Sequence, residues 1–219
     1  MKRIIWFCLL FFGLILSWTL VYAEDSNVIP TKKNSYAPVA KTGQTKSYRT
    51  HDDVDLEKGV AWPTPRFTDN NNGTVTDNLT GLIWLKNANC AGATVNWNTA
   101  IDYAAALYDD CTSCFGTGGD CGLSDGSSEG DWRLPNRNEF LSLMDLAYDN
   151  PALSNAAGTG KWSEGDPFNG VDLQSTNHWS SSTYASNPGI AWYVAFRHGL
   201  VYYSSKSFAN YVWCVRGGN

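Results

Sequence analysis

The sequence predicts an α+β fold in which two helices pack on one twisted, mixed or antiparallel sheet with long connecting loops. Short runs of β-branched and aromatic residues separated by turn formers, which are typical of strands, fill residues 178–216. A second group of such runs lies at residues 67–85, and two segments with helical spacing of apolar residues lie between the groups. The predicted order is therefore a hairpin with a third strand, two helices joined by long loops, and a four-stranded meander.

The first residues have the organisation of a secretory signal peptide. Lys2 and Arg3 form a basic start, an apolar run follows at residues 4–16, and Ala23 provides a small residue for cleavage. This run is too short to span a membrane, and no other stretch of the sequence is expected to do so. We expect an exported protein of the periplasm, cell surface or medium. Its predicted parts are a signal peptide at 1–23, a flexible leader at 24–35 and a single domain at 36–219.

Charge excludes one large class of partner. The 219 residues include 16 Lys or Arg and 21 Asp or Glu, which gives a net charge of −5 at pH 7. An acidic chain is repelled by the phosphate backbone, so nucleic-acid binding is not expected. The predicted domain is long enough to bury one hydrophobic core. Composition leaves the oligomeric state open.

The first strands are expected between residues 67 and 85. Phe67 and Val75 lie on the two arms of a hairpin, and Asn72-Gly73 matches the residues preferred in a two-residue turn. A short buried strand is expected at residues 82–85.

The first helix is expected at residues 96–108. Trp97, Ile101, Ala104 and Tyr108 recur at helical spacing, and Asn96 can cap the first turn.

The second helix begins after Asn136, which forms a capping box with Glu139. Phe140 and Leu143 belong to its apolar stripe. We expect Trp132 and Pro135, just before this helix, to be buried structural residues that do not contact a ligand. A long loop rich in Gly, Asn, Ser and Pro follows at residues 150–176, and loops of that length are usually functional or mobile.

The C-terminal strands are expected at 178–182, 191–196, 200–204 and 211–216. Alternation places Trp192, Val194 and Phe196 on one face of the second of these strands, and we expect that face to line the core. The large side chains that remain must then lie on the outer face or in the turns. Tyr and Asn at such positions provide contact area and hydrogen bonds at low entropic cost.

A ligand site is therefore predicted on the outer side of the C-terminal sheet. Its basic residues would suit a ligand with a carboxylate or sulfate. The predicted ligand-contacting residues are Tyr184, Asn187, Arg197, His198, Tyr202, Lys206, Phe208 and Asn210.

The cysteines fit an exported protein, in which disulfides persist. Four of them lie close together in the sequence, which favours local pairing. We predict a Cys90–Cys121 disulfide that brackets the first helix and a local Cys111–Cys114 loop. Cys214 lies in an apolar strand and is expected to be a buried free thiol.

Calcium is the one candidate cofactor. Asp69, Asn71 and Asp77 have oxygen-rich spacing like that of a calcium loop, although the bidentate Glu at its far end is missing. The alternative is a plain Asn-Gly hairpin without a metal.

Several motifs together resemble the Lcl C-terminal domain family of exported bacterial domains. The motifs are KTGQT at 41–45, GVAWP at 59–63, RFTDNNNGTVTDNLTGLIWLKNANC at 66–90, DWRLPNRNEF at 131–140, and the terminal WSSSTY, AWYVAF and YVWCVRGG. The segment around the second helix and the aromatic C-terminus also resemble the C-type-lectin-like superfamily. Within it they are similar to formylglycine-generating enzymes and to hypervariable binding proteins of diversity-generating retroelements.

The resemblance implies a C-type-lectin-like fold whose C-terminal sheet and loops display ligand-contacting side chains. The adhesin that gives the family its name is implied to bind sulfated glycosaminoglycans, which need a basic surface, whereas this chain is acidic. Formylglycine-generating enzymes use a cysteine pair at a copper site, whereas only Cys214 lies in the C-terminal region here, so that activity does not carry over.

The function expected from the sequence is a non-catalytic, lectin-like or adhesin-like module that binds a glycan or protein ligand. No catalytic residue is predicted, because none of the histidines lies in a catalytic motif. Two alternatives stay open. One is a structural envelope protein, and the other is an enzyme, either a hydrolase or a thiol oxidoreductase that uses Cys111 and Cys114.

Overall fold

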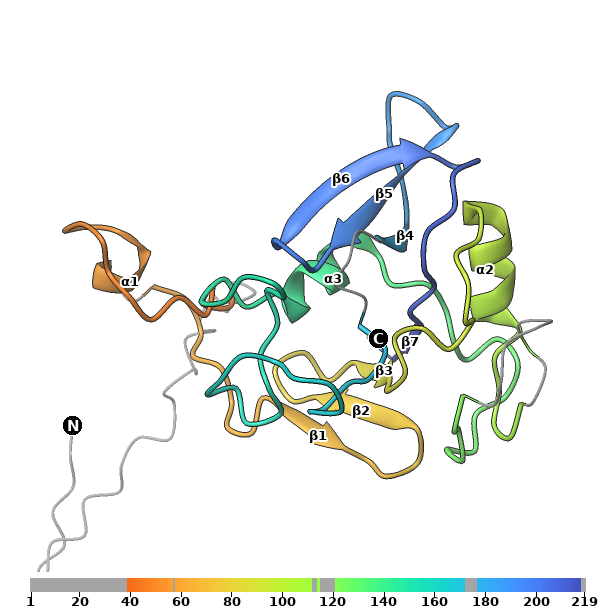
Figure 1. Ribbon diagram of the computed structural model, residues 1–219, viewed down its shortest axis with the longest axis horizontal. Helices are drawn as coiled ribbons and strands as arrows, with labels where there is room; N and C mark the ends of the chain where they lie inside the picture. The colour runs from red at the N-terminus through yellow and green to blue at the C-terminus, as the bar shows by residue number, and fades with distance from the viewer. Residues whose placement is uncertain (1–38, 57, 112–113, 115–120, 172–176, 218–219) are drawn as a thin grey trace, which may run out of the picture. The chain divides into compact units, whose positions relative to one another are not determined.

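The computed structural model describes residues 39–56, 58–111, 114, 121–171 and 177–217 (Figure 1). These residues belong to one compact unit, Pro38–Asn219. The predicted signal peptide and leader lie outside the described residues. A few short helices and two antiparallel sheets form the unit, which confirms the α+β class. None of the helices in the described part is long and apolar enough to cross a membrane.

The first sheet has the order β1-β2-β3-β7 and combines residues from both ends of the domain. Its strands are β1 Phe67–Asp69, β2 Thr74–Asp77, β3 Ile83–Leu85 and β7 Val215–Arg216. The predicted hairpin is present, but its turn has three residues instead of two, because Asn70 N–H bonds to Thr74 O at 3.0 Å. Gly73 is required there: its φ is 81°, and an added Cβ would lie 2.1 Å from the Gly122 carbonyl oxygen.

The second sheet has the order β4-β5-β6. Its strands are β4 His178–Thr183, β5 Ile190–Ala195 and β6 Leu200–Ser205, and each of their ends lies within one residue of the predicted end. The predictions of a single sheet and of a four-stranded meander were wrong. Residues 210–214 pair with scattered partners, including Val95 and Leu85, before β7 joins β3 in the first sheet.

Three helices lie in the described residues: α1 Asp53–Leu56, α2 Trp97–Ala105 and α3 Arg137–Leu143. The Asn96 side chain caps α2 as predicted, by accepting from Thr99 N–H at 3.0 Å. The Asn136–Glu139 capping box of α3 is also confirmed. Helix α2 ends earlier than predicted, because Leu107 N–H turns back to Ala104 and Asp109 N–H bonds to Ser127.

Aromatic rings join the two sheets. Trp84, Trp132, Trp179 and Trp213 are all at most 1% exposed. The Trp213 ring contacts Trp84 of β3, Phe140 of α3, Phe168, His178 of β4 and Phe196, with centroids 5.0–6.3 Å apart. Its Nε1–H donates to the Leu85 carbonyl at 2.7 Å. The predicted burial of Trp132 and Pro135 is confirmed.

A buried ion pair supports the start of the domain. Arg66 is fully buried and pairs with Asp77, and its guanidinium also lies 4.9 Å from the Trp62 ring and 4.4 Å from the Phe67 ring. Burial lowers the pKa of Arg66, and the Asp77 carboxylate opposes that shift. Loss of either partner would leave an uncompensated charge in the core.

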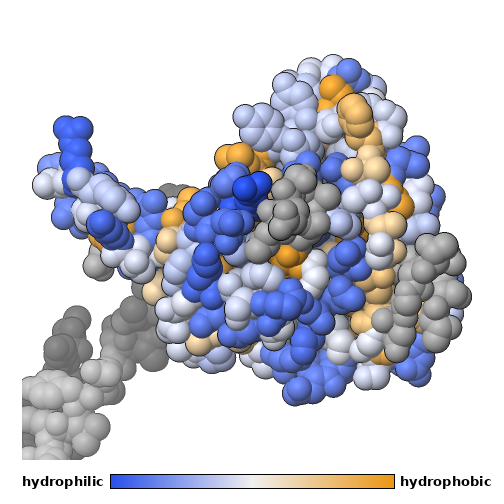
Figure 2. Space-filling model, viewed as in Figure 1, coloured by the Kyte–Doolittle hydropathy of each residue, from blue (hydrophilic) through white to orange (hydrophobic). Residues whose placement is uncertain are grey.

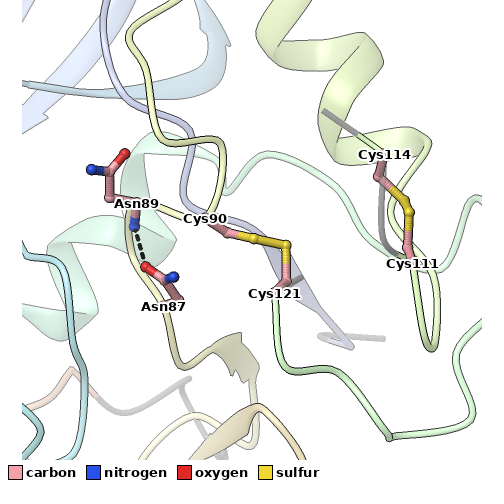
Figure 3. Close-up of a disulfide and its surroundings, with 6 residues drawn as sticks. All are labelled: Asn87, Asn89, Cys90, Cys111, Cys114 and Cys121. Carbon is pink, nitrogen blue, oxygen red and sulfur yellow. Dashed lines mark hydrogen bonds between the residues drawn. A yellow bond between two sulfur atoms is a disulfide. The ribbon is translucent and has the colours of Figure 1, made fainter. Parts of the chain in front are cut away.

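Both predicted disulfides, Cys90–Cys121 and Cys111–Cys114, are present (Figure 3). The first fastens the segment after β3 to the loop that follows α2. Cys214 is a buried free cysteine, as predicted.

Replacing Trp132 with Ala should lower the free energy of unfolding by about 3–5 kcal/mol, because it removes a fully buried ring. It also removes one hydrogen bond of Ser127, whose Oγ accepts from Trp132 Nε1–H at 2.9 Å. Chemical denaturation measures the loss. Phe208→Ala, at a side chain that is 63% exposed, is the control and should change stability little. An unchanged melting temperature for Trp132→Ala would contradict the structural role.

Replacing Cys90 and Cys121 together with Ala should cost about 2–4 kcal/mol, because that disulfide closes a long loop in the unfolded chain. The matched pair Cys111→Ala and Cys114→Ala should cost less, since those residues are only 3 apart in sequence. Non-reducing peptide mapping checks the pairing. Recovery of a Cys111–Cys121 or Cys114–Cys214 peptide would refute it.

Candidate functional site

The strongest candidate site lies on one face of the β4–β6 sheet. Strand register pairs Trp192 with Tyr203, so both side chains project from that face, and Tyr184 follows directly after β4. We call Tyr184, Trp192 and Tyr203, with Arg137 of α3, the aromatic platform. Figure 2, in which this sheet lies at the top, shows residues of intermediate hydropathy there and strongly hydrophilic residues over much of the lower part.

The platform rings form a compact arrangement. Tyr184 and Tyr203 are stacked, with centroids 4.7 Å apart and planes 14° from parallel. Trp192 meets both edge-on, at 5.5 Å from Tyr184 and 5.6 Å from Tyr203. These are favourable aromatic geometries. Tyr203 remains 47% exposed, so the stack presents ring surface to solvent.

Arg137 adds a positive charge to the platform. Its guanidinium lies 4.4 Å from the Trp192 ring centroid. Arg66, Arg133 and Arg216 each pair with a carboxylate, whereas Arg137 has no carboxylate partner among the described residues. The guanidinium is therefore a candidate to receive a ligand's anionic group. Sequence reasoning missed Arg137, because nothing local links the start of α3 to the distant β5.

The opposite face of the sheet carries a second aromatic group. Tyr193 and Tyr202 are stacked with centroids 6.5 Å apart, and Tyr202 is 56% exposed. Burial, and then the neighbouring Tyr202, raise the pKa of Tyr193. On this face Lys206 Nζ lies 3.6 Å from the Trp97 ring centroid and donates to Thr183 Oγ1 at 2.9 Å.

The structure does not bring the eight predicted ligand residues together. Tyr184 and Tyr202 lie on opposite faces of the sheet. Arg197 and His198 lie in the β5–β6 turn, where His198 Nδ1 is 2.8 Å from Asp149 Oδ1. Asn187, Lys206 and Phe208 lie at the other end of the strands.

Two expectations about burial need correction. Asn210 is only 6% exposed, and its backbone pairs with Val95, so it belongs to the interior and not to an outer surface. Trp192 was expected in the core with Val194 and Phe196, but it is half-buried. On this face of β5, Val194 is the last side chain that reaches the core. Trp192 packs on Tyr184, Tyr203 and Arg137 instead.

The predicted calcium ligands have other partners. Asp77 is fully buried against Arg66, and Asp69 lies 2.6 Å from Lys86 Nζ. Asp69 Oδ1 also accepts from Asn71 N–H at 2.9 Å. Since both carboxylates face cationic side chains, the contacts favour the plain hairpin over a calcium loop.

Cys111 of the CxxC motif follows the C-terminal end of α2 and is paired with Cys114. Helix N-termini and neighbouring cations are settings that lower a thiol pKa, whereas the C-terminal end of a helix carries the opposite dipole charge. Cys111 is also only 4% exposed. Burial raises the pKa of the Cys214 thiol to about 12, so this thiol stays protonated at neutral pH.

Comparison with known families identifies the region that holds this site. The model of the Lcl C-terminal domain family matches residues 73–216, which is more than half of the chain and includes the whole aromatic platform. A search of curated proteins gave no match.

Cys214 should not react with Ellman's reagent in the native protein at pH 8, because its thiol is buried and its pKa is raised to about 12. Unfolding in guanidinium should expose the Cys214 thiol and allow it to react. Mass spectrometry of the modified peptides identifies which thiol has reacted. Rapid native labelling at Cys214 would show that the segment before β7 opens or that the thiol is activated.

Proposed function

This chain belongs to the Lcl C-terminal domain family, and from that premise we propose that it is an exported, non-catalytic binding module with a C-type-lectin-like fold. The aromatic platform contacts its ligand, which is a glycan or a protein outside the cytoplasm. Two disulfides are compatible with export, because such bonds persist in oxidising compartments.

The aromatic platform, in which Tyr203 is 47% exposed and Tyr184 and Trp192 are partly exposed, carries this proposal. The core is closed by other residues, including Trp213, Phe140 and Phe196, all fully buried. The rings of the platform are therefore not needed to bury the core. Tyr and Trp are among the residues most enriched where proteins bind partners.

The chemistry of the platform favours a ligand that combines a ring or an apolar face with an anionic group. Flat ring surface is available on Tyr203, and the planar Arg137 guanidinium suits a carboxylate or a sulfate. The surrounding chain is acidic overall, with a net charge of −5. A single local cation therefore favours a ligand with a few placed charges over a dense polyanion.

A glycan array and a pull-down with the purified protein, with and without calcium, would find the ligand. Arg137→Ala and Tyr203→Ala should each weaken binding by about tenfold or more, as expected for residues at the centre of a binding site. Arg137→Lys separates charge from the planar fork and should restore binding only in part.

Tyr48→Ala is the matched control, because Tyr48 is 78% exposed and lies outside the sheet. Circular dichroism should be unchanged in all variants. If Tyr202→Ala abolishes binding while Tyr203→Ala does not, the ligand lies on the opposite face and the platform is not the site.

A further inference from the structure

Most edge strands of the two sheets are covered by other parts of the chain. At the β4 edge, Trp179 N–H bonds to Tyr211 O at 3.0 Å and Ser181 N–H bonds to Pro135 O at 2.8 Å. The short strand β1 is covered at Phe67, whose N–H bonds to Ala156 O at 2.9 Å, and β7 pairs with Arg133. Strand β6, at the other edge of the β4–β6 sheet, is the exception (Figure 1).

The open edge of β6 can be assigned to particular backbone groups. Lys206 N–H bonds to Gly189 O of the preceding turn at 2.9 Å, which fixes the alternation along the strand. Tyr202 and Ser204 therefore bond toward β5, while the amides and carbonyls of Val201 and Tyr203 point outward. No described residue pairs with those outward groups.

Strand β6 also lacks the features that usually protect a sheet edge. Its sequence LVYYSS contains no charged residue and no proline, and the irregular register of this sheet lies in the β4–β5 pair. Leu200, Tyr202 and Tyr203 are 45%, 56% and 47% exposed. An edge of this kind is a template for another strand.

We propose that β6 pairs antiparallel with β6 of a second copy of this chain, about a two-fold axis at Tyr202. The two three-stranded sheets would then form one sheet of six strands. Isologous contacts of this type are the commonest in homo-oligomers.

The register at Tyr202 makes the strand complementary to itself. The outward groups of Val201 in one copy exchange hydrogen bonds with those of Tyr203 in the other. That register also places Val201 beside Tyr203 on one face and Tyr202 beside Tyr202 on the other face. Aromatic pairs and pairs of aromatic with β-branched residues are among the favourable cross-strand neighbours.

The strand ends bring no like charges together in this register. Lys206 of one copy would lie opposite His198 of the other, but its ammonium is turned toward Thr183 of β4 and the Trp97 ring, away from the open edge. His198 is paired with Asp149, whose side chain is 71% exposed. Arg197, in the same turn, leaves that end near neutral. A contact of one strand pair is smaller than the usual interface of about 800 Å² per partner, so the dimer should be weak.

Pairing would place two aromatic platforms side by side, because a two-fold axis normal to the sheet keeps equivalent faces together. A ligand with repeated units could then engage both platforms and gain avidity. Self-association itself does not depend on ligand binding, so it can be tested separately.

Cysteine cross-linking tests the register. In an antiparallel sheet, directly opposed residues outside a hydrogen-bonded pair have Cα atoms about 4.5 Å apart, which a disulfide can bridge. Under mild oxidation, Tyr202→Cys should form a covalent dimer. Phe208→Cys, at a side chain that is 63% exposed but beyond the strand, is the matched control and should not.

Sedimentation velocity over a concentration series tests the association without a cross-link. The unmodified protein should dimerise reversibly, and Tyr202→Lys should weaken the dimer by about tenfold or more, since it brings like charges together. Phe208→Lys should leave the dimer unchanged. A protein that stays monomeric at every concentration, with equal cross-linking of the two cysteine variants, would refute the proposal. Dimers that tolerate Tyr202→Lys would also refute it.

Discussion

The packing around Trp213 is the constraint on which the rest of the domain depends. One indole contacts both sheets, helix α3 and the loop residue Phe168, and its Nε1–H is satisfied by the Leu85 carbonyl. Neither sheet is large enough to bury a core alone, since one has three strands and the other has four short ones. The shared ring cluster makes them a single folding unit, because a buried aromatic side chain stabilises every element that it touches.

A second set of buried contacts explains the N-terminal motifs. Trp62 and Phe67 flank the buried Arg66, which Asp77 neutralises. Gly43 lies so close to Asp145 that an added Cβ would be 2.1 Å from Oδ1. Desolvation raises the pKa of Asp145. Motif residues in this part of the chain therefore serve packing and charge burial, and their presence alone is not evidence of a ligand site.

With the core closed in this way, the C-terminal sheet is left with aromatic side chains on both faces and one uncovered edge. Tyr184, Trp192 and Tyr203 stabilise one another through ring contacts and not through the core. Such a sheet can carry a ligand on a face and a second chain on its edge without rearrangement of the interior. The residues that close the core and those that form the aromatic platform are thus separate sets.

Local features of this protein were determined by the sequence itself. The capping box at Asn136, the pairing of neighbouring cysteines, the burial of Trp132 and the strand positions at 178–205 depend on residues near one another in the chain. Tertiary structure alone decided that β7 leaves the predicted meander for β3, that Arg137 reaches Trp192, and that no described residue covers the outer edge of β6. The physical reason is that alternation fixes which side chains share a face, whereas the neighbour that covers a face or an edge comes from distant segments, whose arrangement follows from the packing of the whole core.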